Sequence, residues 1–341
     1  MPSRPWRCRC CSRNVGEAHH FTSWYLSYFV SLKASSHTVA VPGSVANLGG
    51  GFDTLGVAVE LYLRARIVDV NEAGPGALTV ASSTPPVKGQ NALVRGYAAA
   101  ARRTGRRAPA VTVEVESDIP MAAGLGSSAA ATVAGIRIFE QVTGPLTDEE
   151  LLGAATEVEG HADNAAPALF GGLTSVLERP GLDPVAMRWS WPDDLRLVVA
   201  TPAVGLATAK ARAALADSVP RRDAIFNLQR VLALVHALQS RNFGELREAA
   251  QDRWHQPARA SLVPLLPEVL AIDDADVLAS FLSGAGPSVA VLAARNLERV
   301  SHLLKSMYER AGVAATVRVL GVHMSSEVLT GAGASGHGRT V

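Results

Sequence analysis

A strand, a glycine-rich loop and a helix follow one another directly in the chain, and this unit constrains the fold more than any other feature. Residues 111–116 (VTVEVE) alternate strictly between valine and polar side chains, which predicts a strand with one buried face. The loop IPMAAGLGSSAAATVAG occupies residues 119–135, and an alanine-rich helix is predicted from about Ser128 to Val142. These signals indicate a protein of mixed helices and strands in which a helix begins at a glycine-rich loop.

This loop has the composition of an anion-binding site. Gly124, Gly126 and the small residues Ser127, Ser128 and Ala129 let the backbone approach a ligand closely. The first amide N–H groups of a helix have no partner inside it, and the helix dipole adds positive potential, which suits phosphate. The loop is not a Walker A motif, because it contains no lysine. Ser128 could supply a hydroxyl to Mg²⁺ or to a γ-phosphate. The alternative is a plain glycine-rich turn before a core helix.

Other segments predict further strands and helices without the strict βαβ alternation of a doubly wound sheet. Thr147 and Glu150 have the spacing of a capping box that opens a helix through Val158. Strands are predicted at residues 37–42, 59–70, 195–201 and 315–320, and on both sides of the Gly-Ala-Gly-Pro connection near the end. Within residues 222–240, the apolar stripe of a helix is formed by Ile225, Leu228, Leu232, Val235 and Leu238.

The length and the net charge of the chain indicate how many domains it has and which partners it lacks a charge for. A chain of 341 residues is long for one hydrophobic core, so two packed domains are expected. The net charge of +1 gives no reason to expect nucleic acid or an anionic membrane as a partner. The aromatic run at residues 21–32 is too short and too polar to span a bilayer. We interpret residues 1–36 as an extension that is disordered or not native, and residues 331–341 as a frayed tail.

The three cysteines lie close together at the start of the chain, as Cys8, Cys10 and Cys11. None remains for a disulfide in the body of the protein, which suits a reducing cytoplasm. A zinc site completed by His19 or His20 is an alternative, but the spacing matches no usual structural zinc pattern.

Four motifs resemble those of one kinase superfamily and occur in its order. Residues 120–130 fit P-x-x-x-G-L-G-S-S-A-A, which resembles the ATP-binding motif of the galactose–homoserine–mevalonate–phosphomevalonate (GHMP) kinases. The segments VPGSVANLGGGFDTLG (41–56) and EGHADNAAPALFGG (159–172) resemble motifs of the homoserine kinase family. The segment SGAGPSVAVL (283–292) resembles the third, glycine-rich motif of the superfamily. The similarity covers roughly residues 37–325.

This resemblance implies a fold and an activity. The fold would be the α+β two-domain GHMP kinase fold, with an N-terminal domain (37–196) like the second domain of ribosomal protein S5 and a ferredoxin-like C-terminal domain (197–330). The activity would be ATP-dependent phosphorylation of L-homoserine to O-phospho-L-homoserine in the cytoplasm, which feeds threonine synthesis, with Mg²⁺ as a further cofactor. A homodimer is the working expectation. The alternatives are a kinase for mevalonate or a sugar, and a non-catalytic nucleotide-binding protein. Gly43 and Gly50 depart from the family's usual Ala and Pro, which loosens the first motif.

Phosphoryl transfer depends on positioning and on charge neutralisation. Glu159 is expected at the end of its helix, where the dipole disfavours an anion, and this conflict points to a function. The resemblance makes Glu159 the metal carboxylate, with Ser128 as the second ligand; Glu157 is the competitor, and a solvated helix-end Glu is the alternative. Asp163 would accept the proton of the acceptor hydroxyl or only orient it. The resemblance assigns ATP binding to Pro120, Met121, Ala122, Ala123, Gly124, Leu125, Gly126, Ser127, Ser128, Ala129 and Ala130. Asn91, in GQNALVRG, could contact the adenine side of ATP.

An amino-acid acceptor carries an ammonium and a carboxylate group. Asp53 could recognise the ammonium group and Asn47 other polar atoms, or both could simply hold a turn. A carboxylate favours arginine, whose fork binds it with two hydrogen bonds. Arg212 in GLATAKARAAL and Arg259 in HQPARASLVP stand in contexts that resemble the family's. An Asx-type turn without a ligand is the alternative for residues 163–164. By resemblance, the substrate-binding residues are Asn47, Asp53, His161, Asp163, Asn164, Arg212 and Arg259.

Overall fold

The structure is a computed structural model that describes residues 37–86 and 91–325. The predictions for the N-terminal extension, its cysteines and the frayed tail therefore lie outside the described residues. The chain divides into residues 1–37 and a larger unit that starts at Thr38, and every helix and strand named here belongs to the larger unit. No described helix combines the length and the apolar character needed to cross a membrane.

The first sheet has six strands in the order β3-β4-β2-β5-β6, with β1 paired to β2. Neighbouring strands are antiparallel, except for the parallel pair of β3 and β4. The strict alternation at residues 111–116 was predicted correctly as a strand, because it lies within β4 and Val111 and Val113 are buried. The strands are β1 (Thr38–Ala46), β2 (Leu55–Asn71), β3 (Leu78–Thr84), β4 (Ala110–Ser117), β5 (Leu173–Arg179) and β6 (Leu182–Trp189).

Strand β1 continues past Pro42, where the sequence predicted its end. It pairs with β2 as far as Ala46, and the register shifts between Pro42 and Gly43. Proline cannot donate to the ladder of hydrogen bonds, and an irregularity of this kind is where a strand tolerates it. The strand therefore runs directly into Asn47, the first polar residue of the loop that follows.

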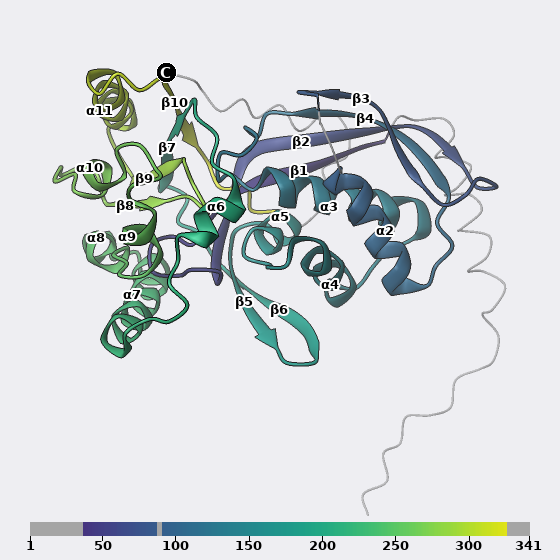
Figure 1. Cartoon of the computed structure of the whole chain (residues 1–341), viewed down its shortest axis with the longest axis horizontal. Coiled ribbons are helices and arrows are strands. Elements are labelled where there is room, and N and C mark those ends of the chain that lie inside the picture. Colours follow the sequence, from purple (N-terminus) through teal and green to yellow (C-terminus); the bar gives the residue numbers. More distant parts are fainter. Residues whose placement is uncertain (1–36, 87–90, 326–341) are drawn as a thin grey trace, which may run out of the picture. The chain divides into compact units, whose positions relative to one another are not determined.

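Four helices pack on one side of strands β1–β4 (Figure 1). The helix α3 contacts β1, β2 and the other three helices, and most of its residues are buried. The predicted capping box is present at the start of α4, with Thr147 and Glu150 each bonded to the backbone of the other. The four helices are α2 (Ala92–Thr104), α3 (Ser127–Thr143), α4 (Asp148–Glu159) and α5 (Ala165–Phe170).

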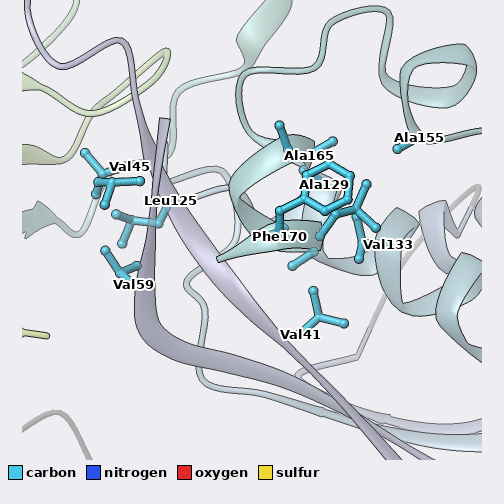
Figure 2. Packing of buried hydrophobic residues seen from close by; sticks show 14 of the residues in the cluster. Val41, Val45, Val59, Leu125, Ala129, Val133, Ala155, Ala165 and Phe170 are labelled. Atoms are coloured by element: carbon cyan, nitrogen blue, oxygen red, sulfur yellow. The ribbon is translucent and has the colours of Figure 1, made fainter. Parts of the chain in front are cut away.

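Leu125 anchors the glycine-rich loop in the core. Its side chain is only 1% exposed, and Figure 2 shows it beside Val45 of β1 and Val59 of β2. One turn into α3, Ala129 lies beside Phe170 of α5. This apolar attachment fixes the centre of the loop, while the residues around it can face outward.

The second sheet has four antiparallel strands in the order β10-β7-β9-β8. Helices separate β7 from β8 and β9 from β10, which gives the β-α-β-β-α-β order of a ferredoxin-like unit. The strands are β7 (Arg196–Pro202), β8 (Ala279–Leu282), β9 (Val289–Ala293) and β10 (Ala315–Leu320). The helices are α6 (Thr208–Ala213), α7 (Arg221–Ser240), the 3₁₀ turn η1 (Phe243–Glu245), α8 (Leu246–Ala249), α9 (His255–Arg259), α10 (Leu266–Leu270) and α11 (Leu297–Arg310). The domain boundary between residues 196 and 197 stays a prediction.

The apolar stripe predicted for α7 is only partly buried. Ile225, Leu228 and Leu232 are 48%, 66% and 73% exposed, whereas Leu234 and Leu238 are buried. The stripe is therefore wrong at its first three residues and right at its end, where Leu238 is buried and Val235 packs against the core. The prediction that residues 222–240 form a helix is confirmed by α7.

Loops from the two sheets meet around the first glycine-rich segment. The Gly284 N–H donates to the Ala46 carbonyl oxygen at 3.1 Å, and the Asn47 amide donates back to the Gly284 carbonyl oxygen at 2.9 Å. Ser283 Oγ donates to the carbonyl oxygen of Gly124 at 2.6 Å. These bonds join segments that are far apart in the sequence, and they form one side of the site described next.

Candidate active site

A cavity lies where the glycine-rich loop, the end of α4, the loop after β1 and helices α6 and α9 meet. All seven predicted substrate residues line this cavity, together with Ser128 and Glu159. The glycine-rich loop between β4 and α3, which we call the phosphate loop, also contributes Ala122, Ala123, Gly124, Gly126, Ser127 and Ala129. Four further lining residues were not among the predicted site residues: Phe52, Thr208, Gly284 and Ala285.

Four carbonyl groups of the phosphate loop accept hydrogen bonds from other segments of the chain. The carbonyl oxygens of Ala122, Ala123 and Leu125 accept backbone hydrogen bonds, each of 3.1 Å, from Leu206, Ser288 and Ser44. The carbonyl oxygen of Gly124 accepts the bond from Ser283 Oγ. The first-turn N–H groups of α3 have no partner within the helix, so the cavity receives the positive end of a helix of 17 residues. This arrangement suits a phosphate group.

The glycines of the loop are needed by the protein itself. A Cβ added to Gly126 would lie 2.2 Å from Ser44 Oγ, and one added to Gly124 would lie 2.3 Å from the Ser283 carbonyl oxygen. Both glycines also have left-handed backbones, with φ of 71° and 76°. The sequence suggested that glycine leaves room for a ligand. The structure shows that glycine leaves room for neighbouring loops and permits the backbone conformation.

Several predicted nucleotide residues do not line the cavity. Leu125 and Ala130 face the core, and Pro120 and Met121 are outside the lining. Asn91 is the N-cap of α2, and its side-chain oxygen accepts a 3.0 Å bond from the Leu93 N–H. A contact between Asn91 and adenine stays a prediction.

Glu159 is the last residue of α4, as the sequence predicted, and it faces the start of α3. Its Oε1 atom accepts bonds from Ser128 Oγ at 3.0 Å and from Thr132 Oγ1 at 2.6 Å. Glu157 instead forms ion pairs with Arg102 and Arg103 and does not line the cavity. Glu159 therefore lies at the cavity, whereas Glu157 lies away from it. Thr132 was missed, although it lies one helical turn after Ser128 and on the same face of α3.

His161 and Asp163 form a second polar pair in the cavity. The Nδ1 atom of His161 lies 2.6 Å from Asp163 Oδ1, and the Asp163 side chain is only 3% exposed. This hydrogen bond is the main cause that raises the pKa of His161 above its usual value, against an opposing effect of burial. Asn164 begins α5, and its Oδ1 atom accepts a 2.9 Å bond from Ser44 Oγ.

Asp53 and Arg212 form a bidentate ion pair with both nitrogen–oxygen distances at 2.8 Å. The bond to Asp53 is the main cause that raises the pKa of Arg212. Asp53 has a left-handed backbone with φ of 51°, and its N–H donates to Asn47 Oδ1 at 3.1 Å. Asn47 thus holds the turn, which was one of its two interpretations, and direct substrate contact by its side chain stays a prediction.

Arg259 is buried beside this pair, with 1% of its surface exposed. Its Nε donates to the Ala211 carbonyl oxygen at 3.1 Å, and its Nη1 lies 3.2 Å from both the Gly284 carbonyl oxygen and His255 Nδ1. Burial, followed by the nearby Arg212 charge, lowers its pKa. The Phe52 ring lies under both guanidinium groups, 5.2 Å from that of Arg259 and 5.6 Å from that of Arg212.

Asp53, His161 and Asp163 also lie within 4.8 Å of one another, which is a spacing that a metal site could have. However, both oxygens of Asp53 accept from Arg212, and Asp163 is bonded to His161. A divalent cation would have to displace a guanidinium group from this position. We therefore interpret these three residues as members of two hydrogen-bonded pairs, Asp53 with Arg212 and His161 with Asp163. The hard oxygens of Glu159 and Ser128 are the better metal ligands.

Four residues at the site escaped the sequence analysis although the chain carries a signal for each. Thr132 and Thr208 lie four positions from Ser128 and Arg212 on the same helices, and His255 lies four positions before Arg259. Phe52 directly precedes Asp53. Periodicity on a helix would have found three of the four.

Comparison with known proteins identifies the family of this chain. Models of the GHMP kinases N terminal domain and the GHMP kinases C terminal domain match residues 91–172 and 234–311. The chain is 38% identical over 284 residues to a homoserine kinase of Thermus thermophilus, across 83% of this chain and 94% of that one. It is 40% identical over 263 residues to a homoserine kinase of Deinococcus radiodurans, across 76% and 85% of the two chains.

A solved structure extends the likeness to three dimensions. The crystal structure of homoserine kinase from Cytophaga hutchinsonii superposes with a TM-score of 0.75 at 27% identity, over 86% of this chain and 97% of that one. The predicted two-domain GHMP kinase fold is thereby confirmed. The chain belongs to the homoserine kinase family of the GHMP kinases.

Proposed function

We propose that this protein transfers the γ-phosphoryl group of ATP to the hydroxyl of L-homoserine, giving ADP and O-phospho-L-homoserine. The observation that carries the proposal is the cavity itself. It combines a phosphate-binding helix start with a carboxylate–hydroxyl pair and with charges of both signs suited to an amino acid. The names of the relatives support the same reaction.

The phosphates of ATP would lie against the first turn of α3. Glu159 and Ser128 offer a carboxylate and a hydroxyl next to this turn, and Mg²⁺ prefers such oxygens together with phosphate oxygens and water. The residues therefore fit a magnesium ion, which would neutralise charge on the phosphates. Thr132 donates to Oε1 of Glu159, and this bond orients the carboxylate.

The acceptor hydroxyl would lie beside Asp163. In the transfer, a bond forms between the hydroxyl oxygen and the γ-phosphorus, and the bond from that phosphorus to the bridging oxygen of ADP breaks. The hydroxyl loses its proton. Asp163 is buried and fixed by His161, so it is placed to accept a hydrogen bond from the hydroxyl and then its proton.

The charged groups of the acceptor would bind at the other end of the cavity. Asp53 suits the ammonium group, and Arg212 and Arg259 suit the carboxylate. Asp53 and Arg212 are bonded to each other, so an amino acid bound between them would replace bonds of this pair by bonds to its own two charges. A neutral sugar or mevalonate has no such pair of charges to offer.

A coupled assay of ADP release tests the proposal. L-homoserine, mevalonate, galactose and shikimate are offered as parallel acceptors, with ATP and Mg²⁺ present. We expect turnover with L-homoserine at least tenfold above each other acceptor, since a missing charged hydrogen bond costs about a factor of ten or more. Preference for mevalonate or galactose would assign another kinase of the superfamily. ATP binding without turnover of any acceptor would indicate a non-catalytic nucleotide-binding protein.

A further inference from the structure

His255 lies next to the cavity without lining it, and its contacts connect two parts of the site. Its side chain is fully buried. Its Nε2 atom is 2.7 Å from the Gly49 carbonyl oxygen, and its Nδ1 atom is 3.2 Å from Arg259 Nη1. The imidazole also stacks on Phe52, with ring centres 5.2 Å apart and planes 29° apart. His255 therefore touches both the loop that carries Asp53 and the arginine assigned to the substrate carboxylate.

The partners of His255 determine where its proton lies. A carbonyl oxygen only accepts, so Nε2 must carry the hydrogen toward Gly49. A guanidinium group only donates, so Nδ1 must offer a lone pair to Arg259. A proton on Nδ1 would place a second cation against Arg259. Burial and the Arg259 charge lower the pKa of His255, while Asp252 and the Gly49 carbonyl oppose them, so the neutral ring is favoured.

The Asp252 carboxylate lies near the same ring nitrogen as the Gly49 carbonyl oxygen. Its side chain is fully buried, and its Oδ2 atom is 3.5 Å from His255 Nε2. The carboxylate is itself held by Asn227 Nδ2 at 2.6 Å and by the N–H groups of Trp254 and Gln256 at 2.9 Å and 2.7 Å. A carboxylate in this position makes the far nitrogen of the imidazole a better acceptor.

The hydrogen bonds of Arg259 show the effect of its bond to His255 Nδ1. A guanidinium group has five N–H donors. The Nε donor reaches Ala211, and the two Nη1 donors reach Gly284 and His255. Among the described residues, no hydrogen-bond partner is found for the two remaining donors, which are both on Nη2. Because Arg259 lines the cavity, these are the donors left for a ligand.

We propose that neutral His255 is a positioning residue that holds Arg259 Nη1, so that both Nη2 donors point to the carboxylate of the acceptor, and that it couples this arrangement to the loop 47–53. The proposal rests on the proposed function, because it takes an amino-acid carboxylate as the ligand. The competing interpretation is a histidine that only fills the core. A core role would change stability, whereas a positioning role must also change the recognition of the acceptor.

Two substitutions test the roles of the two ring nitrogens of His255 separately. In His255→Asn the amide lies near the Nδ1 position and can accept from Arg259, but it cannot reach Gly49. In His255→Gln the amide reaches the Nε2 position and can donate to Gly49, but it leaves Arg259 Nη1 without its acceptor. We expect His255→Gln to raise the KM for L-homoserine by about tenfold, the cost of one lost bond to a buried charged group, while kcat and the KM for ATP change less than about threefold. His255→Asn should raise the homoserine KM less.

A double variant and a matched control complete the test. If His255 acts through Arg259, then His255→Gln should raise the homoserine KM no further in an Arg259→Ala background. His323 is a buried histidine bonded to Tyr62 that does not line the cavity, so His323→Gln should lower thermal stability and leave both KM values unchanged.

Three outcomes would overturn the proposal: an unchanged homoserine KM in His255→Gln, equal rises in the two KM values, or full additivity with Arg259→Ala. A wild type that releases no ADP with L-homoserine is distinguishable from all three. It would refute the proposed function, and the role of His255 would fall with it.

Discussion

Asp53 and Arg212 are 159 positions apart in the sequence, and they are joined at the cavity by two hydrogen bonds of 2.8 Å. Each is also the group assigned to one charge of the acceptor. A zwitterion can replace each partner by its own opposite charge. A ligand with a single charge would leave one partner unpaired and partly buried, which is costly. We therefore expect the pair to favour acceptors that carry both charges.

Acceptors that lack one charge should therefore bind poorly. We expect 3-aminopropan-1-ol, which lacks the carboxylate, and 4-hydroxybutanoate, which lacks the ammonium group, each to lose at least about tenfold in affinity against L-homoserine. Calorimetric titration of the three ligands measures this. Equal affinity of 4-hydroxybutanoate and L-homoserine would remove Asp53 from the site.

In the protein, Arg259→Ala should weaken L-homoserine binding by about 10- to 150-fold, because charged hydrogen bonds are lost. ATP affinity should be unchanged, and lysine should rescue only partly, since a point charge lacks the guanidinium fork. The variant should discriminate much less against L-homoserine lactone, which has no free carboxylate. A parallel loss of ATP binding and thermal stability would instead indicate structural damage, since the stem of an arginine also packs.

Two glutamates two positions apart provide a matched test of the metal site. Glu159→Gln should lower the Mg²⁺-dependent rate by about 100-fold or more, as when one charge-stabilising group is lost, without unfolding the protein. Glu157→Gln should be nearly silent, because Glu157 only pairs with Arg102 and Arg103 at the surface. Steady-state rates and Mn²⁺ binding followed by electron paramagnetic resonance read out both variants. The reverse order of effects would move the metal to the other carboxylate.

Gly126→Ala should damage the phosphate loop through its neighbours. The new Cβ would lie 2.2 Å from Ser44 Oγ, in addition to the left-handed φ of 71°. Gly105 has a φ of 63° and nothing within 4 Å of an added Cβ, so Gly105→Ala carries only the backbone cost of about 1–2 kcal/mol. We expect Gly126→Ala to lower the melting temperature more than Gly105→Ala and to weaken ATP binding. If Gly105→Ala were equally harmful, the contact with Ser44 would not be the cause.

His161 and His323 should titrate on opposite sides of the ordinary imidazole pKa of about 6.5. The bond to Asp163 raises the pKa of His161, and burial lowers that of His323. His161 therefore stabilises the fold fully below pH ~6.5, and this contribution is lost as the pH rises through its raised pKa. Proton NMR of the imidazole signals, assigned with His161→Asn and His323→Gln, measures both values. A His161 pKa at or below 6.5 would contradict the hydrogen bond.

The local parts of the site could be predicted from the sequence, and its long-range parts could not. The loop between β4 and α3, the helix-end position of Glu159 and the capping box at Thr147 depend on neighbouring residues, and the sequence shows them. The bond between Asn47 and Gly284 joins residues 237 positions apart, and no local pattern encodes it. The first half of the apolar stripe on α7 was mispredicted for a related reason, because an apolar stripe does not reveal which of its residues meet the core.

The reason for the loop glycines was likewise hidden. Their spacing suggested room for a ligand, whereas the atoms that would clash belong to Ser44 and Ser283. The small residues of the phosphate loop thus leave room both for a ligand and for neighbouring segments, and only the first of these roles could be inferred from the sequence.

The hydrogen bonds to the carbonyl groups of the phosphate loop limit how the chain could be divided into fragments. Leu206, Ser283 and Ser288 reach Ala122, Gly124 and Ala123 from the second half of the chain. A fragment that ended before β7 would contain every letter of the ATP motif and none of these three donors. The ATP motif alone is therefore not expected to keep its conformation when it is moved into another protein. Exchanging either half for that of a relative would preserve nucleotide binding only if the donors and their carbonyl partners were exchanged together.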